Sequence, residues 1–586
     1  MISVLLAVTT FLAAPAAQSS SSIDTELAAA REVFRRNIEA IQHRDRDAYL
    51  ACYLRSETLA RTGPTGFALG YEPFAAARGP WPDTLEASDL HLTPVREGIV
   101  YGTYRYRVVF DGVETLGLSE RLFLSTNDGW RIAMTSAFEA PRGTPPPPRA
   151  LVGGTLVDGT GAKPVPNALV LIRDGRIEYA GPRRGQTIPA GVDTMDVRGK
   201  WITPGLVDAH VHYSQTGWAD GRPDAMDLRD QYPYAEVEAR LRQHPEGFHR
   251  AWLRCGVTAV FDVGGFPWSV AMAHTTENDP LAPRMAAAGP LLSTLDHWLN
   301  LPAERQFMHL TNDSTARAGV RYLKAMGADA VKVWFIVNSG QTFENMEQSV
   351  MSAGDEARRV GLPLIVHATG IKEARAALRA GAKLLVHSVD DQPLDSEFIE
   401  LLRKNGTIYC PTLTVRGGYY RMFDAARSGK PPVVDDPLHA VDSLTLAHVL
   451  SSATVGAAKV AARKPPDPAV VAKTNQTMNA NLMSVQKAGL PIATGTDAGN
   501  PLTLHGPAIF GEMEAMQAAG LTPMDVLVAS TRNGARAMGR GQDFGTVEKG
   551  RLADLVVVGA DPTRDIAAMR QIRYVVRGGV VRAAGE

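Results

Sequence analysis

The segment ITPGLVDAHVH at residues 202–212 indicates the fold of this 586-residue chain. Its apolar run ends in His210 and His212, which are two positions apart and therefore point to the same face of a strand. Four later apolar runs also end in a polar side chain: Lys332 in ADAVKVW, His367 in LPLIVHAT, His387 in AKLLVHS and Asp497 in PIATGTDAG. Side chains at the C-terminal ends of different strands converge on one site in a (β/α)8 barrel. We therefore expect these six residues to meet.

The residue types favour a metal site. Imidazole and carboxylate groups are ligands of borderline-soft divalent ions such as zinc. A single histidine on an apolar strand is more often a hydrogen-bonded core residue, but three strands with the same ending argue against coincidence. Lys332 would lie in a desolvated interior, where an ammonium is costly and binds no metal. Its amine could instead react with carbon dioxide to give a carbamate, N6-carboxylysine, with two oxygens to bridge two cations. The alternative is a buried lysine that is neutral or ion-paired.

The segments PGLVDAHVH, HATG, VHS and GTDAG, together with Lys332 in VKVWFI, resemble the amidohydrolase superfamily in order and spacing. The closing segment GTVEKGRLADLVVV is similar as well, so the resemblance runs from about Leu151 to Arg582. VKVWFI, GLPLIVHATG and GAKLLVHSVDD are most similar to the branch of imidazolonepropionase-like proteins and metal-dependent Xaa-Pro dipeptidases (prolidases).

This resemblance implies a ligand set and a mechanism. His210, His212 and Asp497 would hold the first ion, His367 and His387 the second, and carboxylated Lys332 would bridge both. The two ions are expected to be zinc, with manganese or cobalt as alternatives. A hydroxide between the ions would attack an amide carbonyl, and Asp497 would carry its proton to the leaving nitrogen.

Further histidines and one tyrosine are candidates for substrate contacts. Tyr213 follows the histidine pair and could stabilise an oxyanion, although a wall-packing aromatic is as plausible. His505, in NPLTLHG, and His297, in STLDHW, could also face the substrate, but Leu295-Asp296 departs from the family pattern. The remaining histidines are interpreted as surface or loop residues, including His244, His249, His439 and His448.

Three functions stay open at this point. The first is a dinuclear hydrolase of C–N bonds that cleaves peptides ending in proline, or N-acyl amino acids, and thus acts as a dipeptidase. The second is a hydrolase of cyclic amides or lactones, or a related deaminase. Family deaminases usually lack the strand-four lysine and carry a glutamate after the fifth-strand histidine, whereas HATG follows here. The third is a binding protein without catalysis. We prefer the first.

The predicted fold is α/β: a (β/α)8 TIM-like barrel with a composite β-sandwich, preceded by an α+β domain. Residues 23–141 combine helical periodicity with alternating strands and resemble the SnoaL-like or NTF2-like cone, which we expect to be an accessory or dimerising domain. The predicted domains are a signal peptide (1–20), this cone domain (23–141), a Pro-rich linker (142–150), the first part of the sandwich (151–203), the barrel (204–544) and the second part of the sandwich (545–586).

Eight segments are expected as barrel strands: LVDAHVH, VTAVFDVG, RMAAAG, ADAVKVWF, PLIVHA, AKLLVHS, TIYCPTLT and PIATGTD. Helical patterns between most of them fit parallel strands. The connection over residues 416–486 is unusually long, and we interpret it as a specificity or lid element or as a plain helical insertion.

The composition restricts partners and location. With 45% hydrophobic residues and a net charge of −1, the chain can bury a core and has no electrostatic attraction to nucleic acid. Residues 2–14 are apolar and precede small residues, which predicts a signal peptide and a periplasmic or secreted protein. An uncleaved anchor is the alternative, and no membrane association is expected after cleavage. The three cysteines predict no disulfide framework, and Cys255 and Cys410 are expected to be buried thiols. We expect a homo-oligomer acting on a small molecule or short peptide.

Overall fold

The computed structural model describes residues 20–63, 66–77, 81–110, 113–139, 147–297, 299–461 and 463–583. The predicted signal peptide falls on residues 1–19 outside this part, as does most of the predicted linker. The chain forms two compact units, residues 1–144 and 145–586.

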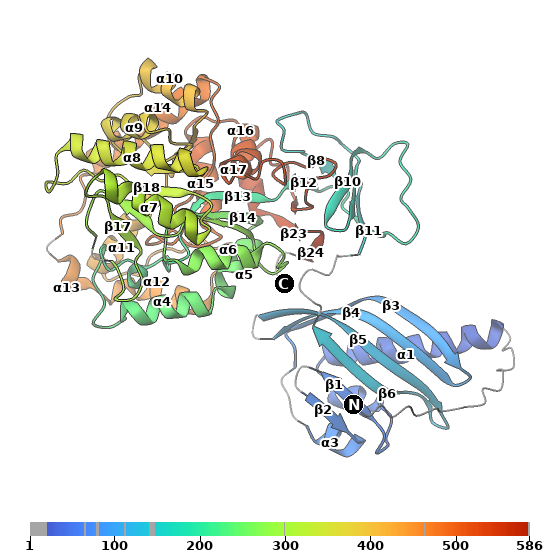
Figure 1. The fold of residues 1–586 in the computed structure, drawn as a ribbon. Coiled ribbons are helices and arrows are strands. Elements are labelled where there is room, and N and C mark those ends of the chain that lie inside the picture. Colours follow the sequence, from blue (N-terminus) through green and yellow to red (C-terminus); the bar gives the residue numbers. More distant parts are fainter. Residues whose placement is uncertain are drawn as a thin grey trace, which may run out of the picture. The chain divides into compact units, whose positions relative to one another are not determined.

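The first unit is a mostly antiparallel sheet, in which only β1 and β6 pair in parallel among the described strands, with a long helix packed against it (Figure 1). The strand order is β2-β1-β6-β5-β4-β3. The helices are α1 (Ser20–Gln42), α2 (Arg46–Ala51) and α3 (Tyr71–Ala76), and the strands are β1 (Ala60–Gly63), β2 (Gly66–Leu69), β3 (Thr84–Arg96), β4 (Ile99–Phe110), β5 (Val113–Thr126) and β6 (Gly129–Glu139). Alternate residues of β4 are buried, because one face of the sheet packs on apolar residues of α1. Its likeness to the NTF2-like cone stays a prediction.

Strands from both ends of the second unit form two sheets with one shared core. The first sheet has the order β10-β9-β7-β11 and the second the order β24-β23-β22-β12-β8. Their strands are β7 (Arg149–Val152), β8 (Thr155–Leu156), β9 (Ala168–Arg173), β10 (Arg176–Pro182), β11 (Asp193–Asp196), β12 (Trp201–Pro204), β22 (Leu555–Val558), β23 (Ile572–Arg577) and β24 (Val580–Ala583). Strand β12 leads directly into the segment that carries His210 and His212. Because β12 pairs with the C-terminal strand β22, the C-terminal part of the chain fixes the position at which this segment begins.

Parallel strands follow in two further sheets, β13-β14-β15 and β17-β16-β18-β19-β20-β21. They are β13 (Leu206–Val211), β14 (Val257–Asp262), β15 (Arg284–Ala287), β16 (Leu291–Ser293), β17 (Phe307–His309), β18 (Val331–Trp334), β19 (Leu364–His367), β20 (Leu384–Val386) and β21 (Ile408–Cys410). Nearly every residue of these strands is buried, as expected for parallel strands covered by helices.

Two of the eight expected barrel strands differ from the prediction. The third is longer than RMAAAG and is broken by Gly289-Pro290 into β15 and β16, since proline donates no ladder hydrogen bond. The eighth, PIATGTD, makes isolated bridges instead of a ladder. It nevertheless lies between β21 and β13, because Ala493 N donates to Tyr409 O at 3.0 Å and Asp497 N donates to His210 O at 2.7 Å.

Helices connect these strands and cover them (Figure 1). They are α4 (Tyr234–Gln243), α5 (Glu246–Arg254), α6 (Trp268–Thr276), α7 (Asp313–Met326), α8 (Phe343–Val360), α9 (Ile371–Arg379), α10 (Ser396–Asn405), α11 (Val415–Ser428), α12 (Ser443–Leu450), α13 (Ala457–Val460), α14 (Pro468–Lys487), α15 (Ala508–Ala518), α16 (Pro523–Val528) and α17 (Gly534–Ala537). The long connection over 416–486 is thus helical. Within the described residues, no helix combines the length and hydrophobicity needed to cross a bilayer.

Candidate active site

The six residues predicted to meet line one cavity of about 290 Å³. Asp497 is at its centre: its Oδ1 lies 3.3 Å from His210 Nε2 and 3.0 Å from His212 Nε2, and its Oδ2 lies 3.8 Å from His387 Nε2. The rings of His387 and His367 are 4.3 Å apart. Parallel strands that end at the same edge therefore bring these side chains together, as the spacing predicts.

Neighbouring groups orient two of the histidines. His212 Nδ1 lies 2.6 Å from the carbonyl oxygen of Gly264, and His387 Nδ1 lies 2.6 Å from Thr412 Oγ1. A carbonyl can only accept, so His212 carries its proton on Nδ1 and offers the Nε2 lone pair to the cavity.

Other polar atoms here lack partners. Both ring nitrogens of His210 and Oδ1 of Asp497 are buried and make no hydrogen bond within the part of the chain that the structure describes. Buried polar atoms are normally satisfied, so such a cluster fits a bound cation. His210, His387 and Asp497 can each offer a ligand atom within 4.8 Å of the others. The donor set therefore fits a divalent metal.

Burial favours the neutral form of three histidines, His210, His367 and His387. It lowers the pKa of His210 and His367 well below the ordinary value, and it lowers the pKa of His387 to about 4. The pKa of Asp497 lies well below its ordinary value because His210 and His212 outweigh the effect of burial. Neutral imidazoles and an ionised carboxylate are the protonation states that bind metal ions.

Lys332 is 1% exposed at the end of β18 and forms no ion pair with any described residue. Burial lowers its pKa to about 8. A substantial fraction of the amine is therefore neutral near pH 8, and only the neutral amine can form a carbamate. Lys332 lines the cavity with the histidines and Asp497, and its role as a bridge stays a prediction.

The backbone is strained at two of these residues. His387 has φ 74° and Asp497 has φ 63°, both in the left-handed region that favours glycine. Such conformations cost about 1–3 kcal/mol each and cluster at functional sites. Thr496, the residue before Asp497, donates from its backbone N–H to Asp208 Oδ1 and from its hydroxyl to Asp208 Oδ2, and these hydrogen bonds hold the second of them in place.

The wall of the cavity includes residues that the sequence did not reveal. Arg222 lies in the loop after β13 and donates to Asp224 Oδ1 at 2.8 Å and Oδ2 at 2.7 Å. It also donates to Asn500 Oδ1, which accepts from the Tyr419 hydroxyl at 2.6 Å. Arg416, also in the wall, pairs with Asp390. These residues sit in loops and an inserted helix, where no periodicity marks them.

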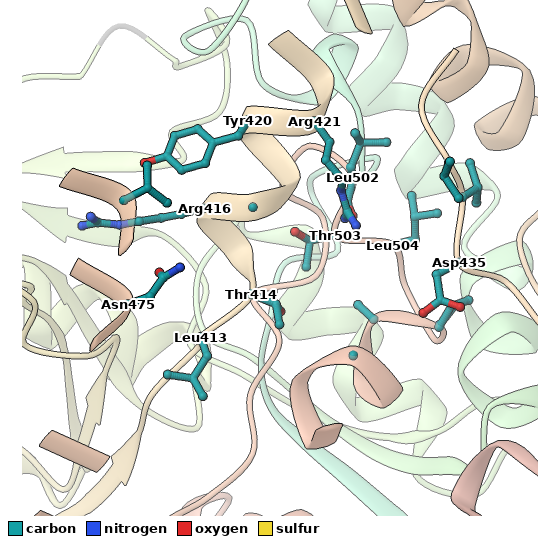
Figure 2. Close-up of a pocket in the computed structure, with 17 residues that line it drawn as sticks. Leu413, Thr414, Arg416, Tyr420, Arg421, Asp435, Asn475, Leu502, Thr503 and Leu504 are labelled. Carbon is teal, nitrogen blue, oxygen red and sulfur yellow. The ribbon is translucent and has the colours of Figure 1, made fainter. Parts of the chain in front are cut away.

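Helix α11 separates this cavity from a second one of about 360 Å³, and Arg416 lines both. Figure 2 shows Arg416, Tyr420 and Arg421 projecting from this helix. Buried Glu512 of α15 holds its N-terminal end, accepting from Leu413 N at 2.7 Å and from Thr414 N at 3.0 Å. The insertion is therefore part of the site's wall.

The structure gives no support to the predicted substrate contacts of Tyr213 and His505. Neither lines the cavity. Tyr213 alternates with His212 along the chain, so its side chain faces outward, and its hydroxyl lies 3.1 Å from His249 Nδ1. His505 stacks on Phe248 with ring centroids 3.9 Å apart. Tyr213 thus matches the alternative of a wall-packing aromatic.

Other histidines also differ from expectation. His297 does not line the cavity either but packs on the wall residues Phe307 and Trp334. His249, interpreted as a surface residue, is buried against Tyr213. His448 is mostly buried too, with Nδ1 3.1 Å from Asp220 Oδ2, because the inserted helix α12 packs inward. The thiols of Cys255 and Cys410 are buried, as predicted.

The model of the amidohydrolase family matches residues 201–582. The chain belongs to this family. Its relatives include an imidazolonepropionase of Rhizorhabdus wittichii, 26% identical over 68% of this chain and 90% of the relative. A 5-methylthioadenosine/S-adenosylhomocysteine deaminase of Symbiobacterium thermophilum is 24% identical over 71% of this chain and 87% of the relative.

Solved structures share the fold. A Xaa-Pro dipeptidase with bound methionine has a TM-score of 0.55 at 21% identity, covering 74% of this chain and 100% of that one. A molinate hydrolase has a TM-score of 0.55 at 24% identity, covering 75% of this chain and 95% of that one. The amidohydrolase is therefore a hydrolase with the TIM-barrel type of fold of its family.

Proposed function

We propose that this amidohydrolase is a dinuclear metal-dependent hydrolase of amide bonds. Its substrates are dipeptides ending in proline, or N-acyl amino acids. The observation that carries the proposal is the meeting of Lys332 with four histidines and Asp497 in one cavity, with Lys332 buried and unpaired among the described residues.

In this proposal His210, His212 and Asp497 would hold one ion, His367 and His387 would hold the other, and Lys332, once carboxylated, would serve as a ligand of both. Bound divalent ions would supply a Lewis acid for the carbonyl and a water of lowered pKa. The protein orients two of the ligand side chains: the Gly264 carbonyl fixes the ring of His212, and the Thr412 hydroxyl fixes the ring of His387.

Asp497 is the proposed proton carrier. Its two oxygens face three histidines from both sides of the cavity, so the carboxylate lies where a water and a leaving nitrogen would both be within reach. Its Oδ1 accepts no assigned hydrogen bond from the described residues and has only the ring nitrogens of His210 and His212 beside it, which leaves a lone pair for this task.

Two arginines support a substrate that carries a carboxylate. Arg222 and Arg416 line the wall of the cavity that holds the predicted metal ligands. Asp224 and Asn500 orient Arg222, and orientation of a guanidinium favours planar, two-point recognition of a carboxylate. A dipeptide or an N-acyl amino acid offers such a group next to its scissile amide. The structural neighbour named Xaa-Pro dipeptidase agrees with this class.

Hydrolysis of a cyclic amide is the second candidate. The relative named imidazolonepropionase agrees with this class. Hydrolysis of a linear amide and hydrolysis of a cyclic amide both begin with attack on a carbonyl carbon. The two reactions therefore require the same metal ligands and differ only in the shape of the substrate.

Metal content of freshly purified protein tests the centre. We expect about two ions per chain, falling sharply in Lys332→Ala, with the circular dichroism spectrum unchanged. One ion per chain that persists in the variant would contradict the bridge and restore mononuclear chemistry.

A substrate panel tests the reaction. Xaa-Pro dipeptides, N-acetyl amino acids and their C-terminal amides should be compared with five- and six-membered lactams. We expect turnover of free acids and much weaker turnover of the matching amides, which lack the carboxylate. Turnover of lactams alone would replace the first proposal with the second.

A further inference from the structure

A buried arginine of the first unit has no acidic partner. Arg121 of β5 is 5% exposed, and its guanidinium donates only to neutral oxygens. Nη1 donates to Ser119 Oγ at 2.6 Å, to the Glu120 carbonyl at 3.1 Å and to Thr135 Oγ1. Nη2 donates to the Tyr104 hydroxyl at 2.7 Å. No described Asp or Glu forms an ion pair with it, and its Nε makes no hydrogen bond.

This arrangement is costly for the unit alone. An arginine side chain stays protonated in proteins, so burial cannot be relieved by loss of the proton. A buried cation without a counter-ion loses several kcal/mol of hydration free energy, which is comparable to the net free energy of unfolding of a typical domain. The neutral hydroxyls of Ser119, Thr135 and Tyr104 orient the guanidinium but leave its charge uncompensated.

Further buried polar groups lie on helix α1 and next to it. Asn37 of α1 is fully buried beside the Tyr53 hydroxyl and the Cys52 thiol, and neither atom of its amide has a hydrogen bond of good geometry to a described residue. The hydroxyls of Tyr53 and Tyr49 are 3.2 Å apart. Burial raises the pKa of Tyr53 well above its ordinary value, so this tyrosine supplies no phenolate as a counter-ion.

Aromatic rings surround the same region. The Tyr104 ring lies under Arg121, 5.1 Å from the guanidinium carbon. Tyr49 is 5.0 Å from Tyr53 and 5.6 Å from Trp81 between ring centroids. Tyr49 and Trp81 are partly exposed and form the rim of this aromatic group.

We propose that the first unit binds an aromatic monocarboxylate. Arg121 pairs with the carboxylate, whose negative charge compensates the cation, and its free Nε–H is one of the donors. The Asn37 amide offers a further donor. The rings of Tyr49, Tyr53 and Trp81 pack against the apolar body of the ligand, as aromatic groups do in offset or edge-to-face contacts. This site is separate from the metal cavity, because every residue of that cavity belongs to the second unit.

Titration calorimetry of the full-length, metal-loaded protein with benzoate tests this site. We expect saturable binding that weakens at least about tenfold in Arg121→Met, the loss typical of a charge-assisted hydrogen-bonded pair. Arg61→Met is the matched control, because Arg61 lies exposed in the same sheet and should leave the affinity unchanged. Benzyl alcohol has the ring without the charge and should bind much more weakly than benzoate.

Two further arms locate the site and identify its ligand class. Benzoate binding should persist in Lys332→Ala, and acetate should bind more weakly than benzoate. If Arg121→Met fails to fold, Arg121→Lys keeps the charge, loses the planar fork and should still weaken binding. Unchanged benzoate affinity in both Arg121 variants would overturn the proposal. Loss of binding in Lys332→Ala, or equal affinity for acetate and benzoate, would overturn it as well.

Discussion

At the scale of single residues, the cavity depends on side chains whose surroundings fix their protonation. Asp497 is held ionised, since its interactions with His210 and His212 outweigh the effect of burial and keep its pKa low. Its backbone is held in a left-handed conformation by neighbours on β13. The protein therefore fixes both the charge and the position of the Asp497 carboxylate before a substrate binds.

Asp497→Asn should reduce kcat by about 10²–10⁴-fold, because the amide cannot accept and return a proton. Steady-state kinetics with metal content measured on the same sample checks this. Unimpaired turnover at normal metal content would exclude Asp497 as the proton carrier.

Arg222→Met should lower kcat/KM for substrates with a free carboxylate by about 10–100-fold, the effect of losing a hydrogen bond to a charged group. The matching C-terminal amides should be affected much less. Arg229→Met provides the control, because Arg229 pairs with Asp227 in the same loop but lies exposed. Equal losses for acids and amides would show that Arg222 only supports the loop.

At the scale of elements, α11 carries Arg416 and Tyr419 to the cavity, and its N-terminal end rests on Glu512. Burial raises the pKa of Glu512 to about 7. The Glu512 side chain nevertheless accepts hydrogen bonds from two backbone N–H groups and from the Thr414 hydroxyl, and these bonds hold the N-terminal end of α11 in place.

Glu512→Gln should therefore lower the free energy of unfolding by about 2–3 kcal/mol, since the amide turns a donor toward these N–H groups. It should also reduce kcat/KM by displacing α11. Urea denaturation and kinetics measure both effects. Glu514→Gln, on the same helix but more exposed, should change little.

These elements show what the sequence could and could not predict. Ligands on buried strands, such as His210 and Lys332, can be predicted from the sequence. The residues around them are apolar because the strands are buried, so a polar residue in such a run is easy to recognise. Arg222 and Asn500 were missed, since loop residues reach the cavity only through tertiary packing. Tyr213 was assigned to the site by its proximity in sequence, although strand alternation directs it away.

At the scale of the whole molecule, an ion pair joins the parallel strands to the C-terminal sheet. Arg284 of β15 donates to Asp554 at 2.6 Å, and Gly578 N donates to the same carboxylate at 2.7 Å. Both charged groups are buried. Although burial acts to raise it, the pKa of Asp554 lies below its ordinary value because of Arg284 and Arg577.

Asp554→Asn should lower the free energy of unfolding by about 2–3 kcal/mol at neutral pH, because buried Arg284 loses its charge-assisted hydrogen bonds to Asp554 and keeps only Glu277 as an acidic partner among the described residues. A carboxyl whose pKa is lowered by folding stabilises the protein above its unfolded pKa, and this contribution is lost as pH falls through the folded pKa. The stability difference between wild type and variant should thus shrink in acid. Thermal unfolding across pH measures it, with Asp193→Asn at an exposed ion pair as control. A difference that is constant with pH would contradict this role.

The two units should also act separately in hydrolysis. Every residue of the metal cavity belongs to residues 145–586. A protein that begins at Pro145 should keep the metal content and kcat of the full chain. A large loss of kcat at normal metal content would show that the first unit contributes to turnover.

The pairing of β12 with β22 has a consequence for the time course of synthesis. Trp201 lies opposite Val558, so the strand that introduces the histidine pair waits for a partner made near the end of translation. At about 5–20 residues per second, that wait is roughly 20–70 seconds. During this interval the nascent chain cannot complete its second unit and remains open to chaperones.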